Sequence, residues 1–201
     1  MPEKTLWSYR ESFDELNYEQ HLPPRWTLMS LFPTGFHPAW GPSPGKGGPG
    51  LGYYGTLPRG DGRTQAIALF EGAPLKPPFS ISVEVRGVQG AVPGLLLAYR
   101  SVVDFEAVER TPLGFRVWGR RGGEALPDRR WDLPADQEGW HLLRVDRGRG
   151  WLRVRWDQGR ARLFRMVGEG EGLVGLMARG GALSFENLRI VQAQVPAAPL
   201  K

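Results

Sequence analysis

The chain has 201 residues, of which 41% are hydrophobic and 23% charged, as expected of a globular protein with one substantial core. Its aromatic content of 11% excludes a disordered chain, so the 28 glycines and 18 prolines indicate the turns of a β-rich fold. The absence of cysteine excludes disulfides, thiolate catalysis and cysteine-ligated zinc.

The formal charge of +5 is unevenly distributed along the chain. Residues 1–78 carry seven basic and seven acidic side chains, whereas residues 110–165 carry fourteen arginines against seven acids. A basic segment of this kind suits nucleic acid, an acidic glycan or an anionic surface. Only four of the 26 basic residues are lysines, however, and the arginine bias of a GC-rich, thermophilic genome is the favoured explanation.

No apolar run reaches membrane-spanning length, and the N-terminus lacks a basic region followed by an apolar one. The sequence therefore predicts a cytoplasmic protein without a membrane partner.

The first part of the chain, residues 1–78, is predicted to be irregular. Residues 9–16 allow either a helical turn or an opening strand, and Pro23 and Pro24 exclude a helix just after it. Glycine and proline dominate residues 41–50, which we expect to form a long loop.

From Pro78 onward, apolar residues alternate with polar ones, as in half-buried strands. In the first such segment Phe79, Ile81, Val83 and Val85 share one face. Further strands are predicted at residues 94–100, 105–110, 114–119, 140–146, 151–156, 160–166, 172–178 and 182–191. Strands joined by short turns, without an amphipathic helix, predict one antiparallel β-sandwich or barrel domain over residues 1–191, with a flexible tail at 192–201.

The order of these segments resembles the concanavalin A-like lectin/glucanase superfamily, in its laminin-G-like and 3-keto-disaccharide-hydrolase-like branches. The resemblance covers residues 79–191, with a weaker echo at Phe13-Asp14 and Trp26. The motifs that carry it are Gly94-Leu95, Tyr99-Arg100, Gly139-Trp140-His141, Trp156-Asp157, Val174-Gly175-Leu176 and Phe185-x-Asn187-Leu188. It implies a jelly roll of two packed antiparallel sheets, whose members bind or cleave carbohydrate; many do neither, so function rests on analogy.

Carboxylates at Asp104, Glu106 and Glu109 form the candidate catalytic set. Retaining glycosidases use two carboxylates about 5–5.5 Å apart, one as nucleophile and one as acid/base. By resemblance to the family 16 glycoside hydrolases, Glu106 would be the nucleophile, Glu109 the acid/base and Asp104 the supporting residue. The order of acids departs from that family's pattern, and plain alternation puts Glu106 and Glu109 on opposite faces unless a bulge intervenes. The alternative is a strand whose charges pair with neighbouring arginines.

Aromatic rings interleaved with arginines form the candidate binding set. Sugar sites present flat rings with a few polar groups around them. Trp118 shares a face with Arg116 and Arg120, Trp151 shares one with Arg153 and Arg155, and Tyr53 and Tyr54 flank the Gly-rich segment where a cleft wall would lie. Core packing for the rings, and cross-strand pairing of the arginines with Asp146 or Asp157, are the alternatives.

Metal and cofactor signals are weak. His21, His37 and His141 share no metal-ligand spacing. Asp14 and Glu186 could offer oxygen to a structural Ca²⁺, but two carboxylates do not specify a site, and no cofactor is predicted.

The leading prediction is non-catalytic binding of an oligosaccharide or polysaccharide. A glycosidase that uses Glu106 and Glu109 is the first alternative, and an arginine-rich face for a polyanion or protein partner is the second. Nucleic acid is disfavoured as a partner, and a homo-oligomer stays open.

Overall fold

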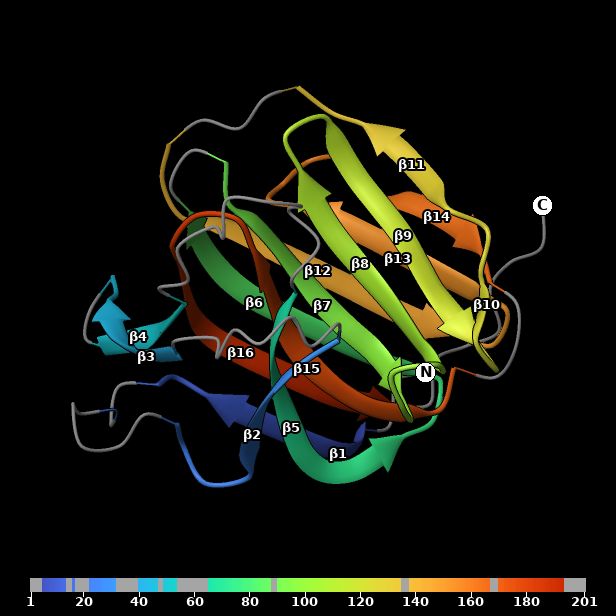
Figure 1. Cartoon of the computed structure of the whole chain (residues 1–201), viewed down its shortest axis with the longest axis horizontal. Coiled ribbons are helices and arrows are strands. Elements are labelled where there is room, and N and C mark those ends of the chain that lie inside the picture. The colour runs from blue at the N-terminus through green and yellow to red at the C-terminus, as the bar shows by residue number, and fades with distance from the viewer. Residues whose placement is uncertain are drawn as a thin grey trace.

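The fold is known from a computed structural model that describes residues 5–13, 16, 22–31, 40–46, 49–53, 65–87, 90–134, 138–166 and 170–193. Within these residues all helical or extended secondary structure consists of β-strands. The strands form two antiparallel eight-stranded sheets. Figure 1 shows the sheets face to face, with β7, β8 and β9 in front of β12 and β13. The predicted antiparallel two-sheet sandwich is confirmed.

Sheet A is the rear sheet of Figure 1. Its central strand β6 pairs with β12 on one side and with β16 on the other, and β1 and β4 both pair with β16. In spatial order its strands are β14 (Arg162–Arg165), β13 (Trp151–Trp156), β12 (His141–Gly148), β6 (Phe79–Gly87), β16 (Leu183–Ala193), β4 (Pro49–Tyr53) and β3 (Trp40–Pro44), with β1 (Thr5–Glu11) beside β16.

Sheet B is the front sheet. Its order places β15 between β7 and β5, so strands far apart in the sequence are neighbours, as in a jelly roll. Its strands are β10 (Glu124–Ala125), β9 (Gly114–Arg121), β8 (Phe105–Thr111), β7 (Val92–Tyr99), β15 (Gly172–Arg179), β5 (Ala66–Leu75) and β2 (Trp26–Ser30), with β11 (Arg129–Asp132) beside β9.

One apolar layer between the sheets forms the main core. Phe79, Ile81, Val83 and Val85 of β6 point into it with at most 1% of their surfaces exposed, as their alternation predicts. Leu95 and Leu97 on β7 belong to the same core cluster from sheet B. Burying each such side chain contributes about 1.5–3 kcal/mol to folding.

The N-terminal part is not irregular, because it contributes strands β1 to β5. In the segment at residues 41–50, predicted to be a loop, residues 41–44 instead belong to β3 and residues 49–50 to β4, and the two strands pair. Prolines are tolerated in β3 because it is an edge strand of sheet A, where a missing amide donor breaks no ladder bond. Just after β3, the Lys46 amide donates to Glu186 at 2.7 Å.

The last strand extends two residues beyond the predicted limit at 191. Gln192 pairs with Phe79 of β6 and with Trp7 of β1, and its side-chain amide donates to the Lys76 carbonyl at 3.0 Å. The rest of the predicted tail, residues 194–201, lies outside the described residues.

A β-bulge interrupts β16 between Glu186 and Arg189, where Asn187 adopts a left-handed φ of 51°. Before the bulge Phe185 points into the core, and after it Leu188 does. The bulge therefore shifts the alternation by one residue and turns Arg189 outward, away from the core.

An ion pair lies between the sheets. Arg147 of β12 is fully buried, and its Nε is 3.0 Å from Glu106 Oε2 on β8. Arg121 approaches the other oxygen of Glu106 at 3.3 Å, and Arg147 also donates to the carbonyls of Gly148 and Trp151. Both charges are thus compensated inside the sandwich.

We predict that Glu106→Ala destabilises the fold by about 3–5 kcal/mol, because it leaves the guanidinium of Arg147 buried without its partner. Urea unfolding of the two proteins measures the difference. The double variant Glu106→Leu/Arg147→Met should recover most of the loss, since neither charge remains; a double variant no more stable than Glu106→Ala would contradict this account.

Candidate functional site

Strand β8 presents its two candidate catalytic carboxylates on opposite faces of sheet B. The pairing of β8 with β9 is regular from Phe105 to Thr111, so no bulge rotates Glu109 toward Glu106. Glu106 lies in the interior beside Arg147, whereas Glu109 lies on the outer face of the sheet. Asp104 is in the turn before β8, where it pairs with Arg100 at 3.4 Å. The structure does not bring these three acids together.

Glu109 is the centre of a polar cluster on the outer face of sheet B. The Gln65 side-chain amide donates to Glu109 Oε1 at 2.9 Å. Arg179 of β15 lies 3.6 Å from the same oxygen, and Arg116 of β9 lies 3.7 Å from Oε2. Three separate segments therefore converge on one carboxylate.

A glycine makes this convergence possible. Gly94 of β7 lies between Glu109 and Met177 in the sheet. A Cβ added at Gly94 would lie 3.3 Å from Cγ of Glu109 and from Cβ of Met177. Because no side chain fills this position, groups from β15 and from the start of β5 can reach across β7 toward Glu109.

Several polar atoms of the cluster are buried without a hydrogen bond to any described residue: Glu109 Oε2, Gln65 Oε1 and the indole Nε1 of Trp118. Burial raises the pKa of the Glu109 carboxyl above its usual value, and the charges of Arg179 and Arg116 only partly oppose this. Two acceptors and one donor on a single face are therefore buried without a hydrogen bond to any described residue, which is uncommon for buried polar atoms.

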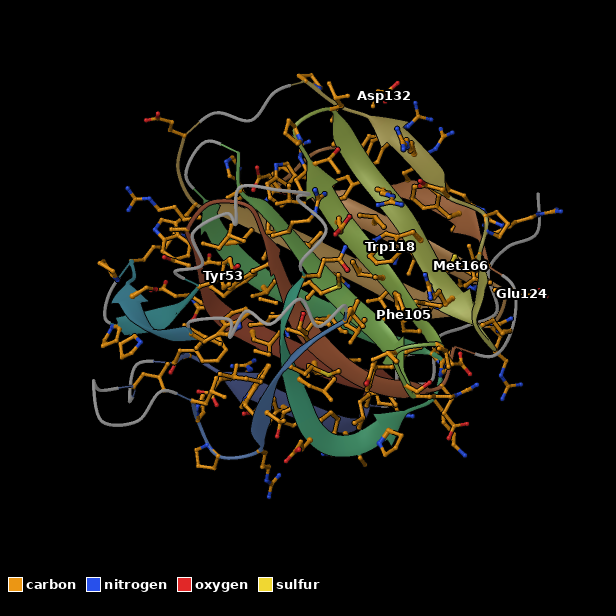
Figure 2. All side chains as sticks on the ribbon, viewed as in Figure 1. Tyr53, Phe105, Trp118, Glu124, Asp132 and Met166 are labelled. Atoms are coloured by element: carbon orange, nitrogen blue, oxygen red, sulfur yellow. The ribbon has the colours of Figure 1, made fainter. Side chains whose placement is uncertain are left out.

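Trp118 joins the cluster to the surface. Its ring meets Phe105 edge-on with centroids 5.1 Å apart, and the guanidinium of Arg116 lies 4.9 Å from its centroid. Arg116 also binds Asp128 at 3.0 Å. Figure 2 labels Trp118 and Phe105, which belong to the neighbouring strands β9 and β8. Trp118, Arg116 and Arg120 are each partly exposed on the same face, as their alternation predicts.

The other half of the candidate binding set lies on the opposite side of the molecule. Leu152 and Val154 of β13 point into the core, so Trp151, Arg153 and Arg155 point outward from sheet A. Arg153 binds Asp146 at 2.8 Å, one of the pairings considered from the sequence. The six arginines and tryptophans thus form two separate surfaces rather than one.

The tyrosines and histidines complete the sequence candidates. Tyr53 is buried in the main core against Trp40, with ring centroids 5.4 Å apart, rather than in a cleft wall. His141 stacks on Trp156 and binds Asp157 at 2.8 Å. Tyr54, His21, His37 and Asp14 lie outside the described residues.

Gln65 and Arg179 were missed by sequence reasoning. Each lies at the end of an apolar strand, Gln65 just before β5 and Arg179 as the last residue of β15. Alternation carried one residue further would have put both on the outer face of sheet B.

Neither metal ligation nor a membrane span emerges from the part of the chain that the structure describes. That part contains no group of three or more His, Asp or Glu side chains able to hold a metal ion. It also forms no helix long and apolar enough to cross a membrane.

Comparison with known proteins yields matches among solved structures alone. No family model matches the chain, and no curated protein does. The carbohydrate binding module CBM66 from Bacillus subtilis is 11% identical with a TM-score of 0.61, over 84% of this chain and 96% of that one. The β-glucanase of Bacillus licheniformis is 11% identical with a TM-score of 0.61, over 94% and 100% of the two chains.

A Bacillus subtilis protein of unknown function with a galectin-like fold is similar to the same degree, with 11% identity and a TM-score of 0.61 over 96% of this chain and 99% of that one. At such identities the likeness concerns the fold. The chain has a concanavalin A-like jelly-roll fold, as the resemblance of its sequence implies.

We predict that Glu109 makes the fold less stable as pH rises. A carboxyl whose pKa is raised by folding binds its proton more tightly in the native state, so its contribution is fully present below the ordinary pKa. That contribution is lost as pH rises through the higher folded value. Glu109→Gln, which mimics the neutral form, should lack this fall and be more stable than the parent at neutral pH. Urea unfolding from about pH 4 to pH 8 tests this, and parallel curves for the two proteins would contradict it.

Proposed function

We propose that this protein binds a carbohydrate, without cleaving it, on the outer face of sheet B around Trp118 and Glu109. The observation that carries the proposal is the set of buried polar atoms without a hydrogen bond to any described residue, beside a partly exposed tryptophan. Sugars present an apolar ring face together with hydroxyl groups that both donate and accept. An indole ring with nearby carboxylate, amide and guanidinium groups matches that chemistry.

The fold supports the same proposal by analogy. Two of the similar structures are those of a carbohydrate binding module and a β-glucanase. Fold alone does not assign function, so the polar cluster is the main support and the similar structures add to it.

Binding is favoured over hydrolysis because sheet B separates the two predicted catalytic carboxylates. Glu106 is held by Arg147 in the interior, and Glu109 faces the opposite side. Two carboxylates on opposite faces of one strand cannot flank a single glycosidic bond.

The matched pair Trp118→Ala and Trp151→Ala tests the proposal. Both tryptophans are partly exposed and carry an arginine near the ring, but they lie on opposite faces of the sandwich. We expect Trp118→Ala to weaken oligosaccharide binding by about tenfold or more, and Trp151→Ala to change it by less than about twofold.

Calorimetric titration with β-glucan oligosaccharides and a panel of other neutral oligosaccharides measures these affinities. Equal losses in the two variants, or no binding across the panel, would overturn the proposal. Release of reducing sugar by the parent protein that is lost in Glu109→Gln would restore the glycosidase alternative.

A further inference from the structure

The outer face of sheet A carries a row of arginines that the proposed function does not use. This face points away from the viewer in Figure 1. The pairing registers align Arg10 of β1 with Arg189 of β16, Arg189 with Ser82 of β6, Ser82 with Arg144 of β12, and Arg144 with Arg155 of β13. One line across five neighbouring strands thus holds four arginines around a central serine. We call it the arginine row.

The row points outward throughout. On β6, β12, β13 and β16 the residues next to a row member belong to the core, as Ile81 and Val83 do beside Ser82. On β1, Tyr9 beside Arg10 packs against the same core. Its four arginines are exposed. At a strand spacing of about 4.8 Å, the row spans roughly 19 Å.

Like charges face each other directly within the row. Arg10 pairs with Arg189 and Arg144 pairs with Arg155 across adjacent strands, an arrangement that destabilises a sheet. Arg144 is partly compensated by Asp146 at 3.2 Å. Arg10, Arg155 and Arg189 make no ion pair with any described residue. An arginine-rich composition explains the residue type, but it does not explain this alignment.

The β16 bulge is part of the arrangement. Uninterrupted alternation from Phe185 would turn Arg189 inward, and the bulge at Asn187 turns it outward into line with Arg10 and Ser82.

We propose that the arginine row binds a linear polyanion, and specifically an acidic polysaccharide laid across the strands. The arginines of the row repel one another because they are neighbours on adjacent strands. A chain of anions bound along the row would lower that repulsion.

Acidic side chains flank the row on both sides and limit the shape of the partner. Glu84 and Glu186 lie beside it on β6 and β16, and Asp146 lies on the other side on β12. Asp146 and Glu186 are buried, and Glu84 pairs with Lys46 at 2.9 Å. These acids neutralise positions beside the row, and the narrow line of charge that is left suits a linear anionic chain better than a broad membrane surface.

The aromatic content of the face distinguishes a polysaccharide from single-stranded nucleic acid. Nucleic-acid grooves combine cations with rings on which successive bases stack. Trp151 lies toward one end of β13, four residues from Arg155, and the row itself contains no ring among its five positions. Charge without stacking favours the sugar polymer.

The test compares the double variant Arg10→Ser/Arg155→Ser with the control Arg130→Ser/Arg149→Ser. Both remove two positive charges from exposed positions, but the control residues lie outside the row, on β11 and in the β12–β13 turn. Calorimetric titration with a heparin oligosaccharide at several salt concentrations measures binding, with uncharged dextran, a thymidine oligonucleotide and phosphatidylserine vesicles as the other probes.

We expect the parent protein to bind the heparin oligosaccharide with an affinity that falls by tens of fold between about 50 and 200 mM salt. The row variant should bind at least about tenfold more weakly and with a shallower salt dependence, whereas the control should stay within about threefold of the parent. Because Trp118 lies on the other sheet, Trp118→Ala should leave heparin binding unchanged whether or not the proposed sugar site exists.

Relief of repulsion provides a second readout without any ligand. In low salt, Arg155→Ser should raise the melting temperature of the free protein by about 1–2 °C, and Arg149→Ser should not.

Equal weakening of heparin binding by row and control variants, no heparin binding at all, or tighter row-dependent binding of the oligonucleotide or vesicles would each overturn the proposal.

Discussion

The apolar layer between sheets A and B determines the direction of each strand residue. A strand that packs on this layer must send alternate side chains into it, and the residues between them onto an outer face. The alternation that buries the core residues therefore also determines which side chains lie on the two outer faces. Ile81 and Val83 point inward, so Ser82 must point outward; Val108 points inward, so Glu109 must point outward.

Charge inside this layer is allowed only where it is matched. Glu106 has the same parity as Val108 and therefore points into the interior, where water cannot solvate its carboxylate. Arg147, on the facing strand of sheet A, supplies both a counter-charge and hydrogen bonds. The acid that resembled a nucleophile in the sequence is thus part of the contact between the sheets, and the pleat separates it from Glu109.

The regular strands from residue 79 onward could be predicted because each one buries a face and so displays its alternation. β1 and the β3–β4 hairpin could not, because they join sheet A at its edges through backbone hydrogen bonds, which leave little trace in the sequence. An edge strand also tolerates proline, which in a sequence indicates a loop. The position of Tyr53 could not be predicted for the same reason. Without a predicted strand at residues 49–53, its alternation could not indicate that the ring points inward toward Trp40.

The candidate sites needed a further kind of information, the lateral register between strands. Parity alone puts Arg116 and Trp118 on one face, but Gln65, Glu109 and Arg179 meet only because β15 lies between β7 and β5. The bulge in β16 had a visible signal, since the apolar positions shift from Leu183 and Phe185 to Leu188 and Ile190. That shift of parity decides that Arg189 points outward.

The two outer faces differ in the chemistry of the ligand that each would suit. On sheet B the polar groups around Glu109 are few, buried and set among apolar side chains such as Met177 and Phe105. The ligand that we propose there would gain affinity from shape and from hydrogen bonds shielded from water. On sheet A the arginine row is exposed to solvent, so its attraction is long in range and screened by salt. The net charge of +5 indicates neither the buried polar cluster of sheet B nor the exposed row of sheet A. The proposed polyanion surface differs from a general excess of arginine because its side chains share one row of one sheet. That alignment follows from the strand order and the register.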